Sequence, residues 1–120
     1  MNKDYTDLEV WQECRKLANT IYELTKAFPK DEIFGLTNQA RKSAVSIASN
    51  IAEGCGRQTS KDTINFLHIA RGSLYEVETQ MFISLDQNYI SKMDFDSVHE
   101  TIQICKRLLN GFINYYRKMQ

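Results

Sequence analysis

The chain has 120 residues, which suffice for one hydrophobic core without disulfide or metal staples and are too few for two domains, so residues 1–120 are predicted to form a single domain. Its 15 basic and 15 acidic side chains give a formal net charge of zero. This balance excludes the overall positive field of histone-like polyanion binders, and any nucleic-acid surface must therefore be local.

The first predicted helix covers residues 7–27. Thr6 and Glu9 match a capping box at its start, and Pro29 follows its end. Apolar side chains recur along it at alternating spacings of four and three, which places them on one helix face. They are Val10, Cys14, Leu17, Ile21, Leu24 and Phe28.

The second predicted helix covers residues 36–54 and is apolar on two faces, a pattern that favours two packing partners. Gly54 is predicted to end this helix in a left-handed conformation, because glycine has no Cβ. The broader apolar face carries Leu36, Ala40, Ala44, Ile47 and Ile51, and the narrower strip carries Val45, Ala48 and Ala52.

The third and fourth predicted helices cover residues 60–87 and 94–119, again with apolar side chains at spacings of three and four. Ser60 is expected to cap the third helix, and Asp94 or Ser91 to start the fourth. The one proline lies outside all four helices, and no segment shows the alternation typical of a strand. The sequence therefore predicts an all-α fold, an up-down-up-down four-helix bundle.

The three cysteines, Cys14, Cys55 and Cys105, are odd in number and far apart, which argues against a disulfide framework or a metal site. Two of them fall on apolar helix positions, which is typical of reduced core thiols in a cytosolic protein. No stretch approaches the roughly 18 to 20 apolar residues that span a bilayer, and the amino terminus has no apolar run of signal-peptide length. We therefore expect a cytoplasmic protein with no membrane contact and no cofactor.

Nearly the whole chain resembles a known family. The most specific segment is QARKSAVSIASNIAEGCGR, residues 39–57, with its Ser-Ile-x-x-Asn-Ile-Ala-Glu-Gly core. The segments FPKDEIFGL before it, FLHIARGSLYEVETQ after it and the opening DLEVWQECRKLANTIYELT also match. Together they resemble the four-helix-bundle family encoded in 23S rRNA intervening sequences, and more distantly the accessory proteins of diversity-generating retroelements.

The resemblance implies that several copies of the chain assemble into a homo-oligomer, because members of this broader group form homopentameric barrels. The retroelement type binds its reverse transcriptase and RNA through basic surface residues, whereas no activity is established for the rRNA-encoded type. The resemblance therefore implies a homopentamer whose partner is RNA or a nucleic-acid enzyme, with no small-molecule substrate.

A polar seam runs down the second predicted helix through Ser46, Asn50, Glu53 and Gly54. A buried polar group without a hydrogen bond costs roughly 2 to 7 kcal/mol, so these side chains need partners. One interpretation is a ligand or subunit contact. The other, which we favour, is a network that fixes helix register, with Glu53 paired to Arg57 four residues on.

The candidate phosphate-binding residues are Arg41, Lys42, Arg57, Lys61 and Arg71. Arg57 and Lys61 flank the amino end of the third predicted helix, where free N–H groups and the helix dipole favour anions. At helical spacing this face is extended by Asn65, His68 and Tyr75. Repetition around a ring would multiply a weak patch into a basic surface. Ordinary solvated helix charge is the alternative interpretation.

The candidate oligomer contact consists of the strip Val45, Ala48 and Ala52 with the aromatic residues Trp11 and Tyr22, since small residues let helices approach closely. These surfaces together predict a non-catalytic oligomeric scaffold that binds RNA through its basic face. The alternative is a protein adaptor, for example for a reverse transcriptase, without nucleic-acid binding of its own.

Enzyme signatures are missing from the sequence. A carboxylate-bridged di-iron bundle needs two Glu-x-x-His pairs, whereas the chain offers Asp96-x-x-His99 and one other histidine, His68. Helical RNases of the Arg-x(4 to 6)-His type need arginine where His68 and His99 have Lys61 and Lys92. A glycine-rich phosphate loop after a strand and a nucleophile elbow are also absent from the sequence. The prediction is a protein that is not an enzyme, and an unrecognised hydrolase would have to depend on His68 or His99.

Overall fold

The structure is a computed structural model that describes residues 4–120. Within these residues it contains four α-helices, two short 3-10 helices and no strand. The elements in chain order are η1 (Tyr5–Asp7), α1 (Glu9–Thr25), η2 (Lys30–Glu32), α2 (Leu36–Cys55), α3 (Ser60–Asp86) and α4 (Lys92–Arg117). Each predicted helix range overlaps the corresponding helix and differs from it by two residues or fewer at either end. The all-α prediction is confirmed.

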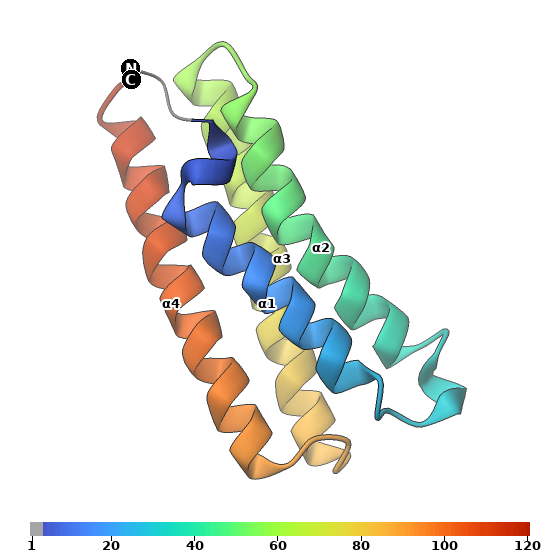
Figure 1. Ribbon diagram of the computed structural model, residues 1–120. Helices are drawn as coiled ribbons and strands as arrows, with labels where there is room; N and C mark the ends of the chain where they lie inside the picture. The colour runs from blue at the N-terminus through green and yellow to red at the C-terminus, as the bar shows by residue number, and fades with distance from the viewer. Residues whose placement is uncertain (1–3) are drawn as a thin grey trace.

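The four helices lie side by side along the long axis, and consecutive helices run in opposite directions (Figure 1). Each helix packs against the next one in the chain, and α1 also packs against α4, so that α1 and α3 occupy diagonal positions. The result is a four-helix bundle of 45 × 25 × 20 Å with η1 and the carboxyl end of α4 at the same end of the bundle. The homopentamer stays a prediction.

The core is formed by the apolar faces that the spacing predicts. Cys14 and Cys105 meet inside it as free, fully buried thiols. A hydrogen bond with Cys105, followed by burial, raises the pKa of Cys14 far above the usual thiol value, so this thiol stays protonated. The larger side chains that are completely buried include Leu17, Ile21, Ile47, Ile51, Leu67, Leu74, Met81, Ile102 and Leu109. Burial of each such side chain contributes about 1.5 to 3 kcal/mol.

The capping box predicted at Thr6 and Glu9 does not form. Thr6 donates its hydroxyl to Asp4 instead, and η1 occupies the segment where the capping box would have started α1. Helix α1 begins after Leu8, which provides no side-chain cap. The local hydrogen bond between Thr6 and Asp4 is therefore the physical reason for the error.

The amino ends of α3 and α4 have side-chain caps. Thr59, not the predicted Ser60, caps α3, and its hydroxyl accepts a hydrogen bond of 3.1 Å from the amide of Asp62. Ser91, one of the two predicted starts of α4, accepts a hydrogen bond of 3.0 Å from the amide of Asp94. Both contacts satisfy a backbone donor that the first helical turn leaves free.

Gly54 is not the left-handed cap that the sequence predicts. Helix α2 continues through it to Cys55, and no glycine among the described residues has a positive φ. A Cβ at Gly54 would lie 3.1 Å from the carbonyl oxygen of Thr63 and 3.2 Å from Cβ of Phe66, both on α3. Thr63 also donates its hydroxyl to the carbonyl of Gly54 at 2.8 Å. Glycine is needed here because the backbones of α2 and α3 approach closely.

Candidate functional site

A groove between α1 and α2 brings together the five side chains predicted for subunit contact. It has a volume of about 400 Å³. Trp11 and Tyr22 line it from α1, and Val45, Ala48 and Ala52 line it from α2. The groove exists because the side chains on α2 are small, and the aromatic side chains on α1 form its wall. The groove therefore joins aromatic and small side chains of two helices, and the polar side chains of Arg15, Asn19 and Ser49 line it as well.

The aromatic side chains of this α1–α2 groove are held in place. The Trp11 ring packs edge-on against Tyr5, with 5.4 Å between centroids and 76° between planes. The guanidinium of Arg15 lies 5.5 Å from the centre of the Trp11 ring, and that of Arg41 lies 4.8 Å from the centre of the Tyr22 ring. Because these contacts fix the rings beforehand, a partner that binds here has little side-chain entropy to overcome.

A second hollow, of about 880 Å³, lies between α1 and the carboxyl-terminal half of α4. Leu8, Cys55, Leu108, Phe112 and Tyr116 supply most of its apolar lining. The spacing on α4 assigns Phe112 and Tyr116 to the core, but both remain partly exposed. Burial, followed by the charge of Asp4, raises the pKa of Cys55, so this thiol is not an activated nucleophile.

The polar seam lies largely between α2 and α3. Ser46 and Ser73 share a hydrogen bond of 2.9 Å between their hydroxyls, and Asn50 donates to both oxygens of Ser46 at 2.9 Å. Gln80 donates to the hydroxyl of Ser43 at 3.3 Å. These contacts tie two helices together, as expected for a network that fixes helix register, although Oε1 of the buried Gln80 has no hydrogen-bond partner among the described residues.

Glu53 and Gly54 contribute to the seam in other ways than Ser46 and Asn50. Glu53 is exposed and pairs with Arg57 at 2.8 Å, the partner expected from the spacing of four residues. Gly54 takes part through its backbone carbonyl and its missing Cβ. The side-chain network of the seam therefore ends at Asn50.

The five candidate phosphate-binding residues are spread over the bundle. Arg41 donates to the hydroxyl of Thr25 at 2.9 Å and lies beside the α1–α2 groove. Arg57 follows the far end of α2, and that end lies about 21 Å from Arg41 by the helical rise; the guanidinium of Arg57 lies 4.5 Å from the centre of the Phe66 ring. Arg71 faces α4, and Lys42, Arg57 and Lys61 are exposed. They do not form one compact patch on a single chain.

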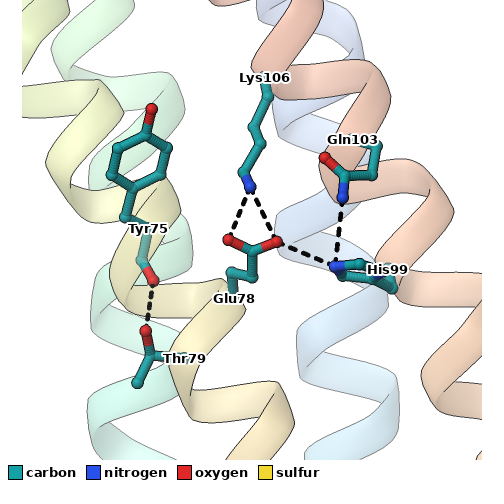
Figure 2. Close-up of polar contacts among 6 residues, drawn as sticks. All are labelled: Tyr75, Glu78, Thr79, His99, Gln103 and Lys106. Carbon is teal, nitrogen blue, oxygen red and sulfur yellow. Dashed lines mark hydrogen bonds and ion pairs between the residues drawn. The ribbon is translucent and has the colours of Figure 1, made fainter.

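A cluster that the sequence analysis missed joins α3 to α4. Glu78 of α3 lies 2.7 Å from the ammonium of Lys106 and 2.9 Å from Nε2 of His99, both on α4 (Figure 2). All three side chains are mostly buried. Gln103 lies beside the same histidine nitrogen, and the ammonium of Lys106 lies 5.3 Å from the centre of the Tyr75 ring.

The electrostatics of Glu78 favour its charged form. Burial raises its pKa, but the hydrogen bonds and charges of Lys106 and His99 together outweigh burial, so the pKa lies below the usual carboxyl value. The sequence hint is weak, because only the spacing of seven residues places His99 and Lys106 on one face of α4. Their contact with Glu78 depends on the register of two antiparallel helices.

Comparisons with known proteins identify the family. The model of the 23S rRNA-intervening sequence protein family matches residues 6–111. The chain belongs to this family. A crystal structure of a protein of unknown function from the S23 ribosomal protein family of Bacteroides thetaiotaomicron VPI-5482 is similar, with a TM-score of 0.78 and 25% sequence identity over 87% of this chain and 97% of that one. A search of the curated proteins finds no match to this chain.

The family match confirms the resemblance drawn from the sequence, and it covers the α1–α2 groove, the polar seam and the Glu78 cluster. None of the helices within residues 4–120 combines the length and the apolar character that a membrane span requires. Nor does the described part of the chain bring three or more His, Cys, Asp or Glu side chains together as a metal site would require.

Glu78→Gln is expected to lower the free energy of unfolding of the protein by about 1 to 2 kcal/mol at pH 7, because it removes the charged partner of a mostly buried lysine. Since the folded-state pKa of Glu78 is lowered, its stabilisation is complete above the usual value of 4.5 and disappears as the pH falls through the folded-state pKa. Urea unfolding between pH 7 and pH 3 measures this. Glu100→Gln, at an exposed position of α4, is the control. A difference between the Glu78→Gln variant and the wild type that is the same at pH 7 and pH 3 would contradict the assignment.

Proposed function

We propose that this protein is a non-catalytic homo-oligomeric scaffold of the cytoplasm that binds RNA through basic side chains on its surface. The observation that carries the proposal is the convergence of all five candidate contact residues on the α1–α2 groove. Preorganised aromatic side chains beside small ones, with polar side chains around them, are typical of a protein interface.

A ring is favoured over a two-fold dimer by the number of apolar surfaces. A cyclic ring uses head-to-tail contacts and therefore needs two different patches on each chain. The α1–α2 groove and the α1–α4 hollow lie on either side of α1 and meet this requirement. The number of five subunits comes from the resemblance to homopentameric barrels.

A non-catalytic role is supported by the surroundings of His99. Its ring stacks on Phe95 at 5.2 Å, packs edge-on against Phe82 and bonds to Glu78. These contacts fix the side chain between α3 and α4, as is typical of a residue that packs a bundle. We propose that His99 stabilises the bundle.

RNA binding is supported by the exposed lysines and by repetition. Lys42 and Lys61 project from α2 and α3, and a ring would present every basic side chain once per subunit. Because phosphate contacts release counterions, RNA affinity should fall steeply with salt even though the chain has no net charge.

The test is a salt titration of RNA binding by the purified oligomer, with wild type compared with a combined Arg41→Ala, Arg57→Ala and Lys61→Ala variant. The variant is expected to bind more weakly, and the slope of log affinity against log salt should fall by about 0.7 for each phosphate that the variant no longer neutralises. Lys16→Ala, Lys26→Ala and Lys92→Ala together remove the same charge from other exposed positions and serve as the control. No binding by the intact oligomer at low salt would contradict the proposal and leave a protein adaptor, for example for a reverse transcriptase, as the function.

A further inference from the structure

Cationic side chains from α3 and α4 meet toward the end of the bundle where α3 begins and α4 ends. Arg117 of α4 places Nη2 3.5 Å from Nε2 of His68 on α3. Arg71 of α3 donates from Nη1 to Oδ1 of Asn110 on α4 at 3.0 Å. The antiparallel register of α3 and α4 therefore sets two guanidinium groups next to one imidazole. We call His68, Arg71 and Arg117 the α3–α4 cationic surface.

This surface lacks a negative partner among the described residues. The carboxylate that lies between α3 and α4 is Glu78, and it is taken up by Lys106 and His99. Neither Arg71 nor Arg117 forms an ion pair within residues 4–120. Burial, followed by the charges of Arg71 and Arg117, lowers the pKa of His68. The local potential is therefore positive and suited to an anion from outside.

An aromatic platform adjoins these charges on the same helix. Tyr75 lies one turn beyond Arg71 on α3, and 45% of its surface is exposed. Gly72, between them, leaves the surface open, since no atom lies within 4 Å of the position that a Cβ would occupy. Guanidinium groups beside an exposed ring form the combination that holds single-stranded nucleic acids, with phosphates on the arginines and bases on the ring.

We propose that the α3–α4 cationic surface binds a backbone phosphate of single-stranded RNA, with Tyr75 stacking against a neighbouring base. This inference rests on the proposed RNA binding and adds one contact site to the basic side chains named for it. The surface lies across the bundle from the α1–α2 groove, because α1 and α3 are diagonal to each other. Subunit contact through that groove therefore leaves the α3–α4 cationic surface open to RNA.

The experiment measures fluorescence anisotropy of a labelled 20-nucleotide oligouridylate with the oligomeric protein at several salt concentrations. Arg71→Gln with Arg117→Gln is expected to weaken binding about tenfold or more and to lower the salt slope by about 0.7 for each phosphate left without its arginine. Lys16→Gln with Lys26→Gln removes the same charge from exposed positions of α1 and its carboxyl end, and this control should stay within about twofold of wild type.

The role of the ring is tested separately. Tyr75→Leu is expected to weaken binding of the oligouridylate about fivefold or more, whereas Tyr75→Phe keeps the stacking surface and should bind like wild type. Polyglutamate is the competing probe of a different class. Competition by polyglutamate equal to that of RNA, with no effect of Tyr75→Leu, would overturn the inference in favour of an acidic protein partner.

The histidine gives a third readout. A phosphate bound beside His68 favours the charged form of its imidazole, whereas the charges of Arg71 and Arg117 disfavour that form. Wild type should therefore bind oligouridylate more tightly as the pH falls from 8 to 6. His68→Gln should flatten this dependence. Equal pH dependence in the variant and wild type would overturn the placement of the phosphate at His68.

The two proposals fail in different ways. If wild-type oligomer does not bind the oligouridylate at low salt, RNA binding itself is wrong and this inference falls with it. If wild type binds but the variant lacking Arg71 and Arg117 matches the lysine control, only the position is wrong. Circular dichroism and the oligomer mass of each variant confirm that the comparison uses folded, assembled protein.

Discussion

Val45→Glu combined with Ala52→Glu is expected to convert the oligomer into folded monomers. Both side chains line the α1–α2 groove, where we place the subunit contact. A carboxylate desolvated at such an interface without a partner costs several kcal/mol, and a closed ring repeats that cost at every contact. Both positions are at least partly open in the single chain, so the fold itself should tolerate the change.

The mass in solution, measured by light scattering after size exclusion, decides this prediction. Ile69→Glu combined with Ile83→Glu adds the same charge at exposed apolar positions of α3 and should leave the oligomer intact. Thermal unfolding followed by circular dichroism checks that every variant is folded. An unchanged mass for the Val45 and Ala52 variant would place the subunit contact outside the groove.

Gly54→Val is expected to lower the free energy of unfolding by about 2 to 3 kcal/mol, as overpacking of a tight helix contact does. Its Cβ would meet the carbonyl oxygen of Thr63 at 3.1 Å and Cβ of Phe66 at 3.2 Å. Neither is the free end of a flexible side chain, so α2 and α3 would have to separate. The hydrogen bond from Thr63 to the carbonyl of Gly54 would be strained as well.

A matched glycine separates packing from helix propensity. Gly111 on α4 has no atom within 4 Å of its ideal Cβ position, so Gly111→Ala should stabilise the protein by about 0.5 to 1 kcal/mol. Urea unfolding measures both changes. If the Gly54→Val variant is as stable as wild type, the close approach of α2 and α3 does not require glycine at position 54.

The helices could be predicted because their signal is local and repeated. The alternating spacing from Val10 to Phe28 predicts a helix even if one of its apolar positions is assigned to the wrong face. The small side chains of Val45, Ala48 and Ala52 leave a groove that no neighbouring helix fills. The spacing therefore predicted the bundle, and the structure places the five contact candidates in one groove.

Caps and tertiary contacts could not be predicted in the same way. Thr59 and Ser60 are both good capping residues in adjacent positions, and only the final backbone decides between them. Gly54 has the local signature of a helix end, but its role comes from α3. The Glu78 cluster depends on the register of α3 against α4, which neither helix encodes alone. The α3–α4 cationic surface depends on the same register.

Native mass spectrometry of the protein mixed with a 20-nucleotide oligouridylate tests whether this protein is an oligomeric scaffold that holds RNA. We expect an ion series at five times the chain mass of 14.0 kDa, together with species heavier by bound RNA. A spectrum that contains only the 14.0 kDa chain, without an RNA adduct, would contradict it.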